Sequence, residues 1–269
     1  MPHLQTRLAG ARAAQQLGLD AVCQRWRDGR ASYRPAGEPF DPRWASVQPV
    51  EDSVAKAYIT KNHYSHSYVA ARFRAGLFVK KPFQKELLCG VGVFSVPMNQ
   101  QVIPAYFPDL GPHEGVELGR FALDDSCAAN AESWALARMK RLLREALPQL
   151  RAVIAYCDPV ERRNIEGTLT KRGHLGTIYR ATNCSYRGRS SPRTLWLAPN
   201  GECMADRTLS KLRQNDTGRD YVLQRLRALG APARLLGESG SDYVARLKVD
   251  RWLRPVRHPG NFAFTFELG

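Results

Sequence analysis

The spacing of apolar residues predicts alternating strands and helices between residues 45 and 181. One helix is predicted to follow Asp52, which can cap it, and to end near Asn62, and another is predicted at 161–172. The strongest amphipathic helix follows Asn130, which can cap it, with apolar residues recurring at helical spacing from Leu136 to Leu150. Apolar runs of strand length lie at 45–50, 68–79, 87–96, 115–123, 152–157 and 176–181. The order β-α-β-β-β-α-β-α-β indicates an α/β fold, with a central mixed sheet and helices on both faces.

The flanking segments are less regular. Residues 1–44 carry two weakly amphipathic stretches and then a polar linker rich in Pro and Gly, which predicts an N-terminal helical extension. In the tail, a helix is predicted at 220–229 and a strand at 262–268. We therefore expect three parts: a helical extension and linker over 1–44, a catalytic domain over 45–190, and a basic C-terminal extension packed on that domain over 191–269.

The net charge says more about the partner of the chain than its overall composition does. The 269 residues carry 40 Lys and Arg against 25 Asp and Glu, for a net charge of +15, and arginine is concentrated in the C-terminal half. This excess favours a polyanionic partner such as double-stranded DNA or tRNA. There is no apolar run of about 18 residues and no secretion signal, so we expect a cytoplasmic protein without a membrane partner. The six cysteines form no C-x-x-C pair, which predicts free thiols.

Three residues could carry chemistry at the ends of predicted elements. His63 and Tyr64 follow the helix predicted to end near Asn62; the histidine could be a general base, a proton relay or a metal ligand, or it could only cap the helix. His66 lies in the same polar loop. Asp158 follows an apolar strand, where ligands of open α/β sheets bind, although it could instead cap the next helix. Together His63, Tyr64 and Asp158 are a candidate site for non-haem iron.

A second group of residues could hold a donor or a nucleic acid. Glu117 and Arg120 lie three apart on one strand, so regular alternation predicts that they project to opposite faces. Ser133 could bind an acyl donor or cap its helix. Mixed aromatic and basic side chains could stack on bases and bind phosphates. We assign donor binding to Arg120, Phe121, Asn130 and Ser133, and nucleic-acid binding to Tyr179, Tyr186, Arg187, Arg189, Arg254 and Arg257.

Several short motifs, in this order on one basic chain, resemble a known family. They are Asn62–Ser67 (NHYSHS), Glu117–Phe121 (ELGRF), Asn130–Ser133 (NAES), Tyr156–Asp158 (YCD), Gly176–Ala181 (GTIYRA) and Tyr186–Gly188 (YRG). Over roughly residues 45–200 the chain resembles Mom, the DNA-modification protein of Mu-like phages, and the element order resembles the GNAT acyltransferase superfamily. The resemblance implies carbamoylmethylation of adenine N6, which protects phage DNA from host restriction enzymes.

The chain departs from ordinary GNAT enzymes where they bind coenzyme A. Those enzymes hold the pyrophosphate with a glycine-rich loop before the central helix. Here residues 124–133 contain no glycine and three carboxylates, which argues against a conventional coenzyme A site. Glycyl-tRNA is therefore the favoured donor, through glycyl transfer and rearrangement, and acetyl-CoA with iron chemistry is the other route. The alternative functions are an acyl-CoA-dependent acyltransferase acting on a protein or small molecule, and a non-catalytic DNA-binding protein.

Overall fold

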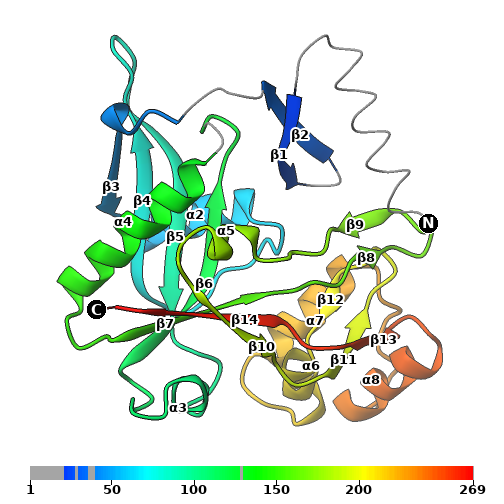
Figure 1. Ribbon diagram of the computed structural model, residues 1–269. Helices are drawn as coiled ribbons and strands as arrows, with labels where there is room; N and C mark the ends of the chain where they lie inside the picture. The colour runs from blue at the N-terminus through cyan, green and yellow to red at the C-terminus, as the bar shows by residue number, and fades with distance from the viewer. Residues whose placement is uncertain (1–20, 28–29, 36–39, 128–129, 269) are drawn as a thin grey trace. The chain divides into compact units, whose positions relative to one another are not determined.

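The computed structural model (Figure 1) describes residues 21–27, 30–35, 40–127 and 130–268. The chain divides into two compact units that are interleaved in sequence. The first unit contains residues 1–157, 175–188 and 262–269, and the second contains residues 158–174 and 189–261. The three-part division expected from the sequence is a different partition and stays a prediction.

A mixed sheet forms the centre of the first unit. Its described strands follow the order β10-β14-β7-β6-β5-β4-β3. The β6 and β7 strands are parallel, while the β3/β4, β4/β5, β5/β6 and β7/β14 pairs are antiparallel. The strands are β3 (Ala45–Pro49), β4 (Ala71–Val79), β5 (Leu87–Ser95), β6 (Gly115–Leu123), β7 (Ala152–Cys157), β10 (Ser185–Arg189) and β14 (Phe262–Glu267). The expected α/β class with a mixed sheet is confirmed.

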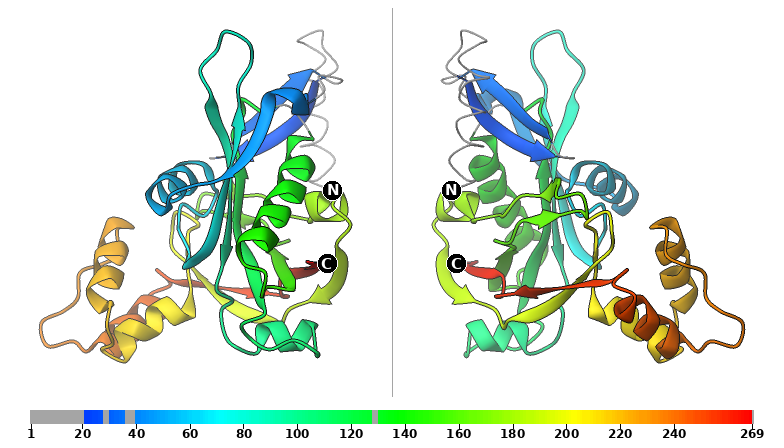
Figure 2. Two further views of the ribbon diagram at one scale, coloured as in Figure 1. Left: turned by 90° about the vertical axis from the view of Figure 1, so that its left-hand side faces the viewer. Right: turned by 90° about the vertical axis from the view of Figure 1, so that its right-hand side faces the viewer.

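Helices cover both faces of this sheet, as the two views of Figure 2 show. On one face, α4 (Ala131–Ala146) buries Leu136, Met139 and Leu143, whose spacing places them on one side of the helix. On the other face, α2 (Asp52–Asn62) buries Ala55 and Ile59 against β5. Because both faces are covered, β5 is buried along almost its whole length, which explains its continuous apolar sequence.

The close approach of α4 to the sheet depends on a glycine. A Cβ atom added to Gly92 on β5 would lie 2.6 Å from the Sδ atom of Met139. A side chain at this position would force the Met139 side chain to shift, so the glycine allows Met139 to pack directly on the strand.

Two predicted elements of the 161–181 region are wrong. In place of a helix over 161–172, the strands β8 (Arg162–Arg163) and β9 (Leu169–Lys171) form a hairpin. Its turn is fixed locally, because the Asn164 side chain accepts a hydrogen bond from the Thr168 amide at 2.7 Å and Gly167 has a φ of +80°. In place of a strand over 176–181, the short helix α5 (Thr177–Arg180) follows Gly176, whose φ is +73°.

The described part of the N-terminal extension also differs from the prediction. The strands β1 (Ala21–Arg27) and β2 (Arg30–Pro35) pair in antiparallel orientation, where we expected helix. Backbone pairing therefore overrides the weak amphipathic pattern here, and residues 1–20 lie outside the described part of the chain. The remaining short elements of the first unit are η1 (Pro42–Trp44) and α3 (Val102–Tyr106).

The second unit has a hydrophobic core of its own. Buried Leu209, Val222 and Leu247 come from three different helices and pack with neighbours from the strands. Besides β8 and β9, its described elements are β11 (Arg193–Leu197), β12 (Cys203–Met204), α6 (Asp206–Arg213), α7 (Arg219–Ala228), α8 (Gly240–Val249) and β13 (Arg254–His258). The sequence predicted α7 but missed α6 and α8. No helix among the described residues of either unit is long and apolar enough to cross a membrane.

Candidate active site

His63 lies at the point where α2 ends. Its backbone N–H donates to the Ile59 carbonyl at 2.9 Å, so it is the C-terminal cap of the helix, and its side chain is buried. The Nδ1 atom of the imidazole lies 3.2 Å from the Ser65 amide and 2.8 Å from the Ser65 hydroxyl. An amide N–H can only donate, so Nδ1 is an acceptor, and the proton of the neutral ring is on Nε2.

Tyr64 stacks on this imidazole and reaches the surface. The two ring centroids are 4.3 Å apart with the planes tilted by 31°. The Tyr64 side chain is 42% exposed, so a substrate can reach it. The turn is completed by His66, which has a φ of 45° and whose Nδ1 lies 3.0 Å from the Thr60 carbonyl. His66 therefore holds the loop in place by its own contact with α2.

A chain of hydrogen bonds links His63 to Arg120 on β6. The Ser67 hydroxyl donates to the Ser65 hydroxyl at 3.2 Å. The Arg120 guanidinium donates to the Ser67 hydroxyl and to the Ser67 carbonyl, both at 2.9 Å. Because the guanidinium is always a donor, the chain is polarised towards His63 and keeps Nδ1 an acceptor. The sequence pointed to Arg120 but missed Ser65 and Ser67, for which the alternating serines of the motif were the available signal.

Glu117 lies on the same strand as Arg120, and a β-bulge separates the two residues. The register between β5 and β6 shifts at Gly119, which interrupts the regular alternation. The expectation that Glu117 and Arg120 project to opposite faces assumed that alternation, and it is not met. Burial raises the pKa of Glu117 while the charge of Arg120 lowers it. Burial also lowers the pKa of Arg120, with Tyr64 and Glu117 opposing that shift. These three side chains therefore share one electrostatic neighbourhood.

The strands β6 and β7 stop pairing at Glu117. Their parallel pairing covers only residues 115–117 and 152–154, and Glu117 is the last paired residue of β6. Ligands of α/β sheets bind beyond the carboxyl ends of strands whose connections diverge. We use the name β6 site for His63, Tyr64, Ser67, Glu117 and Arg120, which the first unit brings together.

Tyr179 is a core residue, not the exposed stacking residue that we expected. Its ring packs on Phe264 and Phe266 with centroids 5.4 and 6.0 Å away. Burial raises its pKa well above the usual range, with Cys157, Tyr64 and Glu117 adding to the shift. Tyr179 can therefore form part of the wall near the β6 site, but it is not available to stack on a solvent-exposed base.

The other residues assigned to nucleic-acid binding are more accessible. On β10, Tyr186 is 49% exposed and Arg187 is exposed, with its guanidinium donating to the Tyr106 carbonyl at 3.0 Å. In the second unit, Arg189 and Arg257 are exposed, whereas Arg254 is half-buried and donates to the Arg163 carbonyl at 3.3 Å. Their role in binding stays a prediction.

Asp158 lies in the second unit and has a full set of partners there. Its Oδ1 accepts hydrogen bonds from His258 Nε2 at 2.8 Å and the Val160 amide at 3.0 Å. Its Oδ2 pairs with the Arg162 guanidinium and with Lys171 Nζ, the latter at 3.4 Å. Burial raises the pKa of Asp158, but Lys171, the His258 hydrogen bond and Arg162 outweigh it and bring the pKa to about 2. We use the name Asp158 cluster for Asp158, Arg162, Lys171 and His258.

This arrangement does not fit a metal ligand. A carboxylate that already neutralises Arg162 and Lys171 offers little attraction to a further cation. His258 is fixed as well, because its Nδ1 accepts from the Gly260 amide at 3.1 Å and its Nε2 faces Asp158. Among the residues that the structure describes, no three His, Cys, Asp or Glu side chains could together hold a metal ion. The iron set expected of His63, Tyr64 and Asp158 therefore finds no support.

Two of the four residues expected to bind a donor, Asn130 and Ser133, lie at the start of α4, whereas Arg120 and Phe121 lie on β6. Asn130 is the N-cap residue of α4, as expected, but its φ is 72° and its side chain makes no capping hydrogen bond. The Ser133 hydroxyl donates to the Asn130 carbonyl at 3.2 Å, and Phe121 packs against the core. Asp124 accepts hydrogen bonds from the Ser126 amide at 2.9 Å and the Tyr58 hydroxyl at 3.1 Å. The first turn of α4 itself contains Glu132, whose negative charge disfavours a pyrophosphate at the helix start.

Comparison with known proteins identifies a family. A model of the Mom protein family matches residues 45–233 of the chain. No curated protein matches it. Among solved structures, the chain is similar to one described as a tandem GNAT protein from the clavulanic acid biosynthesis pathway (without AcCoA). That similarity has a TM-score of 0.40 and 9% sequence identity, and it covers 84% of this chain and 99% of the other.

Proposed function

The chain belongs to the Mom protein family, and we propose that it is a transferase that carbamoylmethylates the N6 amine of adenine in double-stranded DNA. DNA modification is the function of this family of phage proteins. The adenine target, the added group and protection from host restriction are our proposal. The net charge of +15 supports a polyanionic substrate, because basic side chains that replace counterions on phosphates strengthen binding.

The observation that carries the proposal is the hydrogen-bond chain of the β6 site. Arg120 and Ser67 hold Ser65 against His63, and Tyr64 stacks on the same imidazole at the surface. A purely structural cap would not need a partly buried guanidinium to orient its ring, since the His63 backbone already caps α2. The arrangement is that of a positioned hydrogen-bond donor beside an accessible aromatic ring.

Two side chains divide the chemistry in this proposal. Neutral His63 donates its Nε2 proton to the carbonyl oxygen of the donor and stabilises the charge that develops there. Glu117, whose pKa is raised by burial, accepts the proton that adenine N6 loses as it attacks. Adenine N6 is stacked and paired in a duplex, so the base must first leave the stack, at a cost of a few kcal/mol.

We propose a glycyl ester of tRNA as the donor. N6 attacks the ester carbonyl, the carbon–oxygen bond to the tRNA breaks, and the freed ribose hydroxyl takes up a proton. The glycine amine then attacks C6 through a five-membered ring, and the bond from C6 to the original N6 breaks. The old N6 becomes the carboxamide nitrogen, so no oxidant is needed. The carboxylates near the start of α4, which disfavour a pyrophosphate, support this donor over acetyl-CoA.

Isotope labelling tests the function and the donor together. DNA from cells that express the chain is digested, and its nucleosides are analysed by mass spectrometry after feeding with 13C,15N-glycine or 13C-acetate. We expect a modified adenine with both added carbons and the ring-attached nitrogen from glycine. Label from acetate but not from glycine would refute the glycyl route and favour acetyl-CoA with iron chemistry. An unmodified adenine would refute the modification itself and leave a DNA-binding protein or an acyltransferase with another substrate.

The role of Glu117 is tested with a neutral isostere. Glu117→Gln removes the base, so the modification rate should fall by about 100-fold or more while DNA affinity is unchanged. The pH profile should also lose its acidic limb. Glu86→Gln is the matched control, because Glu86 is an exposed carboxylate outside the β6 site. A Glu117→Gln protein that keeps the rate and the pH profile of the control would show that Glu117 is not the base.

A further inference from the structure

The second unit exposes two adjacent leucines at the tip of the loop between α7 and α8. The side chain of Leu236 is fully exposed and that of Leu235 is 61% exposed. Gly237 follows with a φ of +77°, a backbone conformation that turns the chain sharply after the leucines. We use the name leucine loop for residues 234–238.

Hydrogen bonds to Glu238 and from Arg246 on α8 hold the leucine loop in place. The Leu235 amide donates to the Glu238 carboxylate at 3.0 Å. Arg246 on α8 makes two hydrogen bonds to the same carboxylate, at 2.7 and 2.9 Å. The hydrogen bond from Arg246 is the largest influence on the pKa of Glu238 and helps to hold it at about 2, so the pair stays ionised near neutral pH. Leu235 is thus tied to α8 through one shared carboxylate.

Two further contacts tie the segment before the leucines to α8. The Tyr243 hydroxyl donates to the Pro232 carbonyl at 2.7 Å, and Arg246 donates to the Ala233 carbonyl at 2.9 Å. An apolar tip that costs free energy in water is therefore presented in a fixed conformation. That combination is typical of a preorganised binding element.

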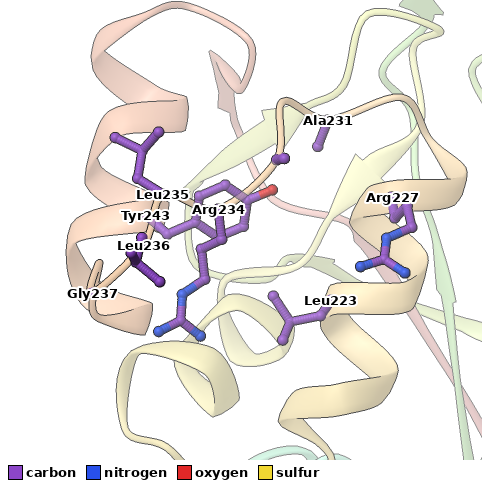
Figure 3. Close-up of a pocket in the computed structure, with 9 residues that line it drawn as sticks. Leu223, Arg227, Ala231, Arg234, Leu235, Leu236, Gly237 and Tyr243 are labelled. Atoms are coloured by element: carbon purple, nitrogen blue, oxygen red, sulfur yellow. The ribbon is translucent and has the colours of Figure 1, made fainter.

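Two basic side chains line a cavity beside the leucines. A cavity of about 560 Å³ beside the loop is lined by Leu223, Tyr243 and two arginines, Arg227 and Arg234 (Figure 3). Arg234 donates to the Glu238 carbonyl, and Arg227 has no ion-pair partner among the residues that the structure describes. Residues 189–261 contain 14 Lys and Arg against 7 Asp and Glu. The chemistry of the patch is therefore apolar at its tip and cationic around it.

We propose that the leucine loop is a wedge that inserts Leu236 between base pairs of duplex DNA, while Arg227 and Arg234 bind the flanking phosphates. Proteins that unstack DNA use this combination, with an apolar side chain entering a base step and arginines holding the backbone. The inference rests on the proposed function, because it supplies the unstacking that access to adenine N6 requires. Charge favours DNA over a protein or membrane partner, since an apolar docking surface alone would not need the unpaired arginine.

The test measures base unstacking directly and does not depend on catalysis. Duplexes carry 2-aminopurine, which brightens when it leaves the stack, at several adenine positions. Wild-type protein should raise the fluorescence, Leu236→Ala should lose most of that rise, and Leu236→Met, which keeps an apolar wedge, should retain it. Leu87→Ala is the matched control, because Leu87 is also exposed but belongs to β5. Leu236 makes no core contact, so circular dichroism should show an unchanged fold.

Modification rates give the second readout. Leu236→Ala should lower the rate on a matched duplex by about tenfold or more, and a mismatch at the target adenine should restore it, because that base is already unstacked. The wedge proposal would be overturned if Leu236→Ala lost the same fraction of its rate on the matched and on the mismatched duplex. It would also be overturned if Leu236→Ala gave the same 2-aminopurine fluorescence as the control Leu87→Ala. If Leu236→Ala instead lost only the binding of tRNA or of a protein partner, the wedge proposal would also be overturned. If wild-type protein modifies no DNA, the fluorescence result still decides whether the loop unstacks bases.

Discussion

Removing the Asp158 carboxylate should destabilise the second unit rather than only stop catalysis. In Asp158→Ala, the ammonium of Lys171 and the guanidinium of Arg162 lose their shared counterion. The Lys171 side chain is only 7% exposed, so water cannot replace the carboxylate. Lys171 Nζ also donates to the backbone carbonyls of Asp158, Val160 and Arg172, at 3.0 Å each, and these orient the ammonium but carry no charge that could neutralise it.

The size of the effect follows from two estimates. Removing one partner of a buried ion pair costs about 3–5 kcal/mol. The pKa of Asp158, about 2 against a usual 3.8, corresponds to roughly 2 kcal/mol between the ionised and the protonated forms. The second figure is smaller because a protonated carboxyl still bonds His258 and the Val160 amide, whereas alanine does not. We expect a loss of about 3 kcal/mol or more, a large share of a typical domain's stability.

Urea denaturation monitored by tryptophan fluorescence and circular dichroism measures this loss, since Trp196 and Trp252 lie in the second unit. Hydrogen exchange should rise at 158–174 and 254–261. Asp158→Asn should lose less, because an amide oxygen can still accept from the Val160 N–H. Glu145→Ala is the control: its ion pair with Arg141 is exposed and should contribute no more than about 0.5 kcal/mol.

The pH dependence has a definite sign. The folded-state pKa of Asp158 lies below its unfolded value, so its contribution is complete above about pH 4 and is lost as the pH falls towards 2. The difference in unfolding free energy between wild type and Asp158→Ala should therefore shrink over that range. If Asp158→Ala is as stable as wild type at pH 7 but fails to modify DNA, the structural assignment is refuted and Asp158 takes part in the chemistry.

Three further predictions concern the β6 site and the basic surface. Ser67→Ala breaks the link from Arg120 to the histidine, so it should lower kcat by about tenfold with little change in KM, and an unchanged kcat would contradict the positioning role. His63→Ala should abolish modification, read out as the modified nucleoside, with unfolding and DNA affinity nearly unchanged; if restriction protection persists in this variant, the chain acts by binding alone. Replacing Arg187 and Arg189 with Ala should weaken DNA binding at all sequences and flatten its salt dependence, and an affinity insensitive to salt would contradict the electrostatic basis.

Elements with strong, continuous patterns were predictable from local sequence. The strands at 115–123 and 152–157 have the bounds expected, because their apolar spacing matches the face that they bury. The helix before His63 ends where expected but begins one residue earlier, since Glu51 and not Asp52 is its N-cap. The errors at 161–181 have local causes, since Asn164 and Gly176 impose turn conformations that an apolar pattern does not register. Helices α6 and α8 were missed because their apolar stripes are short and interrupted by charged residues.

The candidate site was predictable only as a set of residue types. The polar loop after α2 and the ELGRF strand singled out His63, Tyr64 and Arg120, and the structure brings them together through Ser67. Glu117 joins them because of a bulge at Gly119, which depends on pairing with β5 and leaves no periodic trace in the sequence. Asp158 was expected in the same site, yet its partners Lys171 and His258 come from positions 13 and 100 residues away.

The amino-acid sequence was enough to give the α/β class, the basic character that favours nucleic acid, and the motifs that resemble the Mom family. These properties depend only on residue types and on spacings of a few residues, so they can be recognised without the folded structure. The tautomer of His63, the buried charge cluster around Asp158 and the rigid presentation of Leu236 came only from the tertiary structure. Each depends on which distant groups desolvate or hydrogen-bond a side chain, and burial and long-range pairing are properties of the folded chain alone.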